Sequence, residues 1–169
     1  MYITRNTTRQ KVLLEQERRV FRTSDLAVLW RMSNKNTLLT TIKRYVQKQV
    51  LHRLVKGVYA TTPMRKLHPY EIGCAVAGPL AYVSTESILS SEGVIMQQPT
   101  KITLVGKKSL EFELAGHQYL CRYLNPQYLV DRTGITDNGR FSTAKTARAI
   151  ADMKHFDPQY HFDNQKAVK

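Results

Sequence analysis

The chain has 169 residues, an apolar content of 42% and a formal net charge of +13, values that suit one folded domain or two small ones. No apolar run approaches the ~18 residues of a membrane-spanning helix, and the first residues lack the apolar core of a signal peptide, so we expect a cytoplasmic protein. Residues 1–68 hold 15 Lys and Arg against 3 Asp and Glu, whereas residues 69–169 hold 11 against 10. This concentration of charge, without a broad apolar face, favours a polyanionic partner over a membrane surface.

Two helices are predicted before the most basic stretch. The first covers about residues 7–18. The second begins at Thr23 or Ser24, either of which can cap it, with Asp25 near the positive end of its dipole. Trp30 falls on the apolar face of the second helix, so we interpret it as a core residue rather than as a stacking platform for nucleic acid.

A third helix, capped by Ser33 or Asn34, runs into a basic hairpin. Its apolar stripe is predicted to be Leu38, Leu39, Ile42 and Val46, and its opposite face is polar and basic. After it, residues 51–54 and 58–61 alternate around Lys56-Gly57, which predicts two short strands and a tight turn. A helix that enters a major groove, followed by a hairpin on the flanking backbone, forms the DNA-reading part of a winged helix. The candidate DNA-binding residues are Lys35, Asn36, Thr37, Thr40, Thr41, Lys43, Arg44, Lys48, Arg53 and Lys56.

A domain boundary is predicted near Pro63 and Pro69, because two prolines so close together interrupt both strands and helices. We therefore expect an α+β protein with two domains. Residues 1–66 form an N-terminal winged helix-turn-helix domain, and residues 67–169 form a C-terminal α/β domain with a small, mainly antiparallel sheet.

The C-terminal domain is predicted to alternate between helices and short strands. Its expected elements are a helix at 69–77, a strand at 80–83, a helix capped by Ser84 that ends at Gly93, an antiparallel meander of strands at 101–105, 110–114 and 119–124, a loop at 125–140, a helix capped by Ser142 or Thr143, and a polar tail from about 157 without structure.

Both predicted domains contain short sequence motifs. In the first domain they are Thr23-Ser24-Asp25-Leu26-Ala27, the Lys43-Arg44 helix and Gly57-Val58-Tyr59. In the second they are the segments 82–89, 99–105 and 141–153. Together these motifs resemble the AbiEi family, the antitoxins and autorepressors of AbiE-type abortive-infection systems. Lys145 stands where an acid is usual in that family, and Ile88 replaces the usual small residue.

The resemblance implies a function in phage defence. It implies a type IV toxin–antitoxin system in which the chain represses its own operon by cooperative binding to inverted repeats in the promoter. It further implies a neighbouring gene for a nucleotidyltransferase-like toxin, whose effect the antitoxin counteracts without a stable complex. Two alternatives stay open: an antitoxin that neutralises its toxin by direct protein binding, and a winged-helix transcriptional regulator unrelated to any toxin. RNA binding ranks lower because aromatic residues are not interleaved with the basic ones.

Signs of catalysis are weak, so we expect no enzyme, no metal site and no cofactor. Gly106-Lys107-Lys108 lacks the glycine spacing of a phosphate-binding loop and predicts a plain turn. Asp152 has no identifiable catalytic partner, and we interpret it as a structural hydrogen-bonding group or a contact for a partner protein. Cys74 and Cys121 lie in apolar segments and are expected to be buried free thiols.

Overall fold

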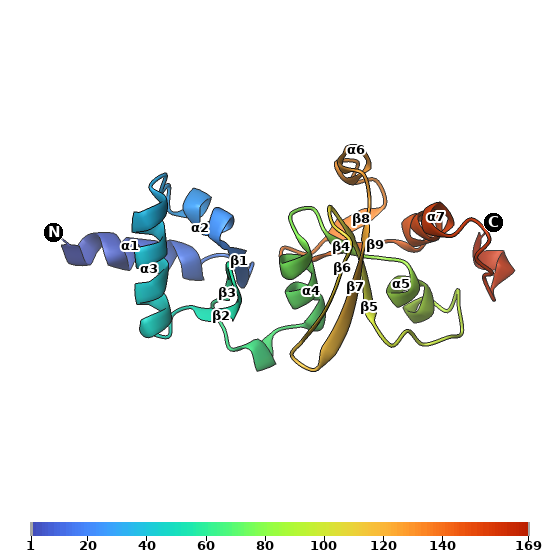
Figure 1. Cartoon of the computed structure of the whole chain (residues 1–169), viewed down its shortest axis with the longest axis horizontal. Coiled ribbons are helices and arrows are strands. Elements are labelled where there is room, and N and C mark those ends of the chain that lie inside the picture. The colour runs from blue at the N-terminus through green and yellow to red at the C-terminus, as the bar shows by residue number, and fades with distance from the viewer. Residues whose placement is uncertain (1, 169) are drawn as a thin grey trace. The chain divides into compact units, whose positions relative to one another are not determined.

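The computed structural model describes the backbone of residues 2–168 and the side chains of residues 8–166 and 168. It divides into two compact units, residues 1–71 and residues 72–169, each with its own β-sheet (Figure 1). The fold class is α+β, as predicted from the sequence. No helix in the described part of the chain is both long enough and apolar enough to cross a membrane.

The first unit combines three helices with a small sheet. Its strands pair antiparallel in the order β1-β3-β2, and Tyr59 of the central strand lies opposite Phe21 on one side and Arg53 on the other. The hairpin predicted around Lys56-Gly57 is confirmed, whereas β1 was not predicted because three residues give no detectable period. The elements are α1 (Tyr2–Leu14), β1 (Val20–Arg22), α2 (Thr23–Leu29), α3 (Lys35–Gln47), β2 (His52–Val55), β3 (Val58–Ala60) and the 3₁₀ helix η1 (Met64–Lys66).

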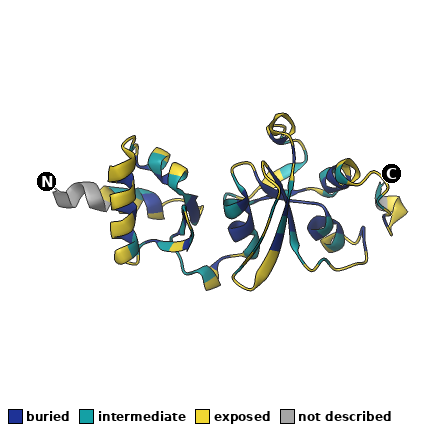
Figure 2. Ribbon diagram, viewed as in Figure 1, coloured by how far each residue is buried: buried dark blue, intermediate teal, exposed yellow. Residues whose placement is uncertain are grey.

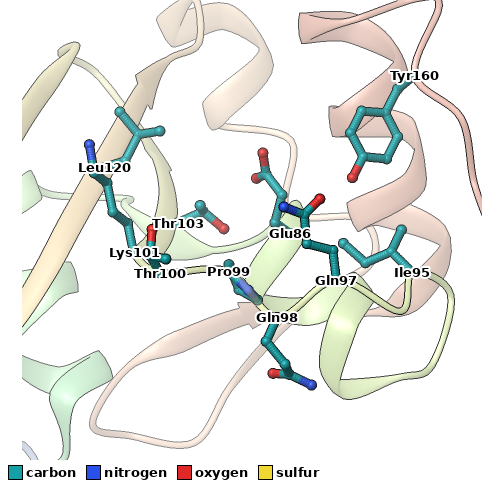
Figure 3. A pocket seen from close by; sticks show the side chains of 10 residues that line it. All are labelled: Glu86, Ile95, Gln97, Gln98, Pro99, Thr100, Lys101, Thr103, Leu120 and Tyr160. Carbon is teal, nitrogen blue, oxygen red and sulfur yellow. The ribbon is translucent and has the colours of Figure 1, made fainter.

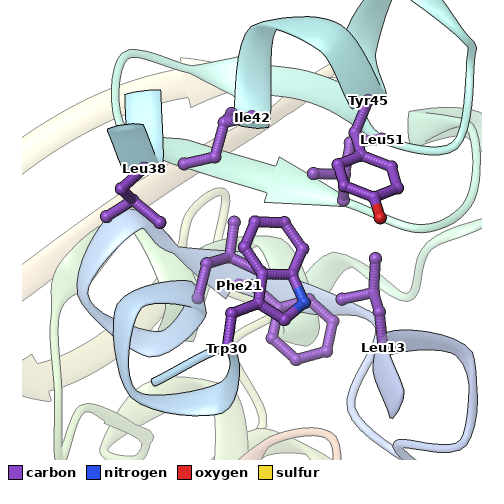
Figure 4. Close-up of a cluster of buried hydrophobic side chains, with 8 residues drawn as sticks. Leu13, Phe21, Trp30, Leu38, Ile42, Tyr45 and Leu51 are labelled. Atoms are coloured by element: carbon purple, nitrogen blue, oxygen red, sulfur yellow. The ribbon is translucent and has the colours of Figure 1, made fainter. Parts of the chain in front are cut away.

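The core of the first unit is built around Trp30 and Tyr45, whose rings stack with centroids 5.3 Å apart. Trp30 is 7% exposed, which confirms its predicted place in the core. This cluster fixes α3 against α1, α2 and the sheet, because side chains from all of them meet there (Figure 4). Its buried members are Leu13, Phe21, Leu26, Trp30, Leu38, Ile42, Tyr45 and Leu51.

The second unit is built on a six-stranded mixed sheet of order β6-β7-β5-β4-β9-β8. Its elements are α4 (Pro69–Ala77), whose first residues belong to the first unit, β4 (Tyr82–Val83), α5 (Glu86–Ser91), β5 (Ile102–Gly106), β6 (Leu110–Leu114), β7 (His117–Tyr123), α6 (Pro126–Leu129), β8 (Ile135–Asp137), β9 (Ser142–Ala144), α7 (Thr146–Phe156) and the 3₁₀ helix η2 (Gln165–Val168).

The predicted meander is wrong in its pairing, although all three of its strands exist. β5 pairs with β7 in parallel, and β6 pairs antiparallel with β7 on the outer edge, so β5 and β6 are not neighbours. The sheet is also larger than expected and contains a second parallel pair, between β4 and β9. Strand β5 is buried on both faces from Thr103 to Gly106, which requires an interior position in the sheet.

Helices cover both faces of this sheet. Helix α4 lies on one side, and α5 and α7 lie on the other (Figure 1). Gly73 allows α4 to approach closely, because a Cβ atom there would lie 2.8 Å from the Tyr119 ring. On the opposite face, the Thr103 backbone N–H donates to Ser87 of α5 over 2.8 Å, and Thr103 Oγ1 accepts from the Ser87 N–H. Helix α4 therefore packs closely on β7, and α5 is anchored on β5.

Two further predictions for the second unit are wrong. Ser142 and Thr143 belong to strand β9, and the cap position of α7 is Lys145. The polar segment after residue 157 is not a free tail, since Phe162 is 4% exposed and the Asn164 N–H donates to the Val94 carbonyl over 3.1 Å. The buried ring of Phe162 and this hydrogen bond together hold the polar segment on the unit.

Candidate nucleic-acid interface

Helix α3 has one buried and one exposed side (Figure 2). The buried stripe is Leu38, Thr41, Ile42 and Tyr45, spaced by three, one and three residues as a helix requires. Nine of the ten candidate DNA-binding residues are exposed, seven of them on α3 or directly after it and two in the hairpin. These are Lys35, Asn36, Thr37, Thr40, Lys43, Arg44 and Lys48, with Arg53 in β2 and Lys56 in the following turn.

Thr41 is the exception, and its assignment as a DNA-binding residue is corrected. It is 2% exposed, and its hydroxyl donates to the Thr37 carbonyl over 2.8 Å. The predicted apolar stripe was rotated: Leu39, expected inside, is 41% exposed, and Tyr45 occupies the core instead. A threonine hydroxyl can lie in solvent or bond to a backbone carbonyl in the core, so the sequence alone did not place Thr41. The aromatic ring of Tyr45 gains more free energy by burial than the Leu39 side chain does.

Local hydrogen bonds hold α3 and the hairpin in place. The side chain of Asn34 caps α3 by accepting from the Thr37 N–H over 3.0 Å. The Thr23 N–H, at the start of α2, donates to the Gly57 carbonyl over 3.0 Å. This bond ties the tip of the hairpin to the start of α2. Gly57 itself has φ +80°, a conformation that favours glycine.

The exposed cations of α3 and the hairpin have no carboxylate partner within the described residues. Because these side chains are exposed and their charges are not neutralised, they can all donate charged hydrogen bonds to an anionic ligand. The ion pairs of this unit use other side chains, Lys11 with Glu15, Arg18 with Asp25 and Arg19 with Glu71. The six unpaired cations are Lys35, Lys43, Arg44, Lys48, Arg53 and Lys56.

One exposed polar residue was missed by the sequence reasoning. Gln47 follows Asn36, Thr40 and Lys43 at intervals of three and four residues, so the four side chains lie in one stripe along the exposed side of α3. The correct apolar stripe would have revealed it, because Gln47 lies opposite the buried residues. Its amide has the donor and the acceptor that an adenine edge requires, as does that of Asn36.

The second unit contains a buried polar network around Asp152, which is 5% exposed. Its carboxylate accepts from the Tyr82 hydroxyl over 2.9 Å, from the Ser84 hydroxyl over 2.7 Å and from Arg148 Nε over 3.0 Å. Burial and the negative charge of Asp152 raise the pKa of Tyr82. Ser84 was predicted to cap α5, but Thr85 takes that position. The network supports the structural interpretation of Asp152.

A pocket of about 280 Å³ lies in the same unit, between the start of α5, the segment 95–101 and Tyr160 (Figure 3). Glu86 lines it and is held by Arg122, whose two terminal nitrogens each donate to one carboxylate oxygen over 2.6 Å. Burial would raise the pKa of Glu86, but the bonds from Arg122 outweigh it and hold this pKa below its usual range. The Glu86 carboxylate that lines the pocket is therefore already paired with Arg122. Among the described residues, no three His, Cys, Asp or Glu side chains are grouped as metal ligands.

No protein-family model matches the chain, and a search of curated proteins finds no match.

Proposed function

We propose that the first unit is a winged helix-turn-helix domain that binds double-stranded DNA. The element order α1-β1-α2-α3-β2-β3 and the sheet order β1-β3-β2 suit that fold. In this reading α2 and α3 form the helix-turn-helix, α3 enters the major groove, and the β2–β3 hairpin is the wing on the flanking backbone.

Six exposed cations on α3 and the hairpin carry this proposal, because none of them has a carboxylate partner in the part of the chain that the structure describes. A duplex would neutralise them with phosphates and release the counterions condensed on the DNA. The polar stripe from Asn36 to Gln47 would then face the base edges, with lysines and arginines on both sides of it. A solvated surface needs no such segregation of charge, because its cations and anions are interspersed.

We further propose that the protein is an autorepressing antitoxin of the AbiE type, acting in the cytoplasm. This part rests on the motif resemblance in residues 20–61 and 82–153. It implies binding to inverted repeats in its own promoter and antagonism of a nucleotidyltransferase-like toxin encoded beside it. The Asp152 network and the Glu86–Arg122 pair, whose hydrogen bonds are made within the second unit, give that unit a structural framework.

A mobility-shift titration tests DNA binding. The purified protein is titrated onto the DNA upstream of its own gene, with scrambled competitor of the same length, at several salt concentrations. We expect binding that resists the competitor, fills half-sites in steps and has a logarithmic salt slope of about −5 if the six cations each meet one phosphate. Equal affinity for promoter and scrambled DNA would contradict the repressor function and leave only an electrostatic anchor.

The antitoxin function needs a separate test. The protein is co-expressed with the product of the adjacent gene, and growth rescue and co-purification are measured together. We expect rescue of growth without a stable stoichiometric complex. Rescue accompanied by a complex that survives gel filtration would instead support neutralisation by direct protein binding, and a neighbour without toxicity would favour a transcriptional regulator of another kind.

A further inference from the structure

Leu39 is an exposed leucine at the border between the buried stripe and the polar side of α3. The residue is 41% exposed, with buried Ile42 on one side and the exposed Lys35, Asn36 and Lys43 on the other. An apolar protein surface that covered Leu39 would also have to desolvate the two lysines beside it, at a large cost in free energy. The partner that suits Leu39 must therefore combine an apolar group with negative charge at a distance of one helical turn.

The major groove of DNA has this combination. Base edges there present hydrogen-bond donors and acceptors and a single apolar group, the C5-methyl of thymine, and phosphates border the groove on both sides. Lys35 and Lys43 can reach phosphates while the leucine methyl groups contact the thymine methyl.

We propose that Leu39 is a specificity-determining residue that reads a thymine methyl group in the operator. This inference rests on the proposed DNA-binding function. Leu39 lies three residues after Asn36, a rise of about 4.5 Å along the helix, which is close to the ~3.4 Å between base pairs. The amide of Asn36 suits an adenine edge, so the two side chains meet neighbouring base pairs, and the half-site contains an A·T-rich step at this point.

Replacement of thymine by deoxyuridine tests this inference, because it removes the methyl group and leaves the base pairing unchanged. A protected site is first mapped by footprinting on the promoter duplex, and each thymine within it is then replaced in turn. For the wild-type protein, we expect one position per half-site at which deoxyuridine raises the Kd about fourfold, the effect of one buried methyl group. In the Leu39→Ala variant, the Kd for the thymine duplex rises and the difference between thymine and deoxyuridine at that position disappears.

Two variants serve as controls. Lys43→Ala should weaken binding to both duplexes and keep the fourfold ratio, because its contact is with a phosphate. Thr40→Ser removes the only methyl group of an adjacent exposed side chain and should also keep the ratio. Thermal unfolding of Leu39→Ala should match the wild type closely, since the side chain is partly in solvent.

The outcomes separate this inference from the function on which it rests. If the wild type binds the promoter specifically but no deoxyuridine position matters, or if Leu39→Ala keeps the ratio, the readout by Leu39 is wrong and the repressor function stands. If Thr40→Ser abolishes the ratio, the methyl contact belongs to Thr40 and the inference is overturned. If the wild type shows no preference for the promoter, the proposed function fails and the inference with it.

Discussion

The Tyr82 hydroxyl donates a hydrogen bond of 2.9 Å to the Asp152 carboxylate, although the two residues are 70 positions apart in the chain. Arg148 joins them, donating to Asp152 through Nε over 3.0 Å and to the Tyr82 hydroxyl over 3.0 Å. The bonds connect strand β4 to helix α7 inside the second unit. Because Tyr82 and Asp152 are almost fully removed from water, the hydrogen bonds within this network replace those that water would supply.

Replacement of Asp152 by Asn should destabilise the second unit by about 2–4 kcal/mol, because it leaves the buried Arg148 without its counter-charge. The Arg148 side chain is 13% exposed and cannot recover full hydration in place. Urea unfolding followed by far-UV circular dichroism measures the loss. The matched control is Glu111→Gln, which breaks the exposed pair with Lys101 and should cost less than about 1 kcal/mol. Equal effects of the two variants would show that the network contributes little.

Leu38 and Leu39 provide a matched pair for the core of the first unit. They are adjacent in α3, and their exposed fractions are 4% and 41%. Leu38→Ala should lower the free energy of unfolding by about 2–4 kcal/mol because it opens a cavity, whereas Leu39→Ala should cost less than about 1 kcal/mol. The fluorescence of Trp30, the single tryptophan of the chain, reports on this unit. A larger loss for Leu39→Ala would mean that the helix is rotated from its described position.

The apolar pattern of α3 predicted the helix but not its exact orientation. Four apolar residues, Leu38, Leu39, Ile42 and Val46, fit one stripe. In the structure Leu39 is exposed, Val46 is partly buried against the core, and Thr41 and Tyr45 join the buried stripe. Threonine and tyrosine are ambiguous in a sequence, because each has an apolar part that packs and a hydroxyl that needs a partner. The direction of the core, which decides between the two stripes, is set by tertiary contacts such as the stacking of Tyr45 on Trp30.

The strands of the second unit were predictable as segments but not in their order. Turn residues and alternation located β5, β6 and β7, whereas the pairing of β5 with β7 depends on how strongly each strand is buried. Strand β6 alternates between half-buried and exposed residues, the pattern of an edge strand, and this could have placed it outside. Strands β8 and β9 are three residues long, too short to show any period.

The double replacement Lys43→Ala with Arg44→Ala should abolish operator binding at physiological salt. At low salt, where binding can still be measured, the magnitude of the salt slope should be smaller by about 2, since two phosphate contacts are lost. Both side chains are exposed and without ion pairs among the described residues, so the unfolding midpoint should change little. Lys107→Ala with Lys108→Ala is the control, because it removes the same charge from an exposed turn of the second unit. If the control weakens binding equally, net charge rather than α3 determines affinity.

Replacement of Thr40 and of Thr41 should have opposite effects on DNA affinity and on stability. Thr40 is exposed in the polar stripe of α3, whereas Thr41 is 2% exposed and bonded to the Thr37 carbonyl. Thr40→Ala should raise the Kd for the promoter duplex several-fold without lowering stability. Thr41→Ala should do the reverse, with a loss of about 1 kcal/mol in unfolding free energy and unchanged affinity of the folded protein. The opposite assignment would restore Thr41 as a DNA-binding residue.

Alkaline pH should destabilise the protein through its buried thiols. Cys74 and Cys121 are free and buried, as predicted from the sequence, and burial raises the pKa of Cys74 to about 12 and that of Cys121 to about 11. In the unfolded chain a thiol has a pKa of about 8.5. Above that pH the unfolded state releases protons that the folded state keeps, so stability is full below about pH 8.5 and falls as the pH rises toward the folded values.

The slope of this loss can be assigned to one thiol by comparison with Cys74→Ala. Once the unfolded thiol is ionised and the folded thiol is not, each buried cysteine contributes about 1.4 kcal/mol per pH unit. Urea unfolding in the presence of reductant at pH 7.5, 9 and 10.5 should therefore show a shallower decline for Cys74→Ala than for the wild type. Other titrating groups, including Tyr82, affect both proteins equally and cancel in the difference. Parallel declines would mean that Cys74 ionises in the folded protein, and hence that burial does not keep it protonated.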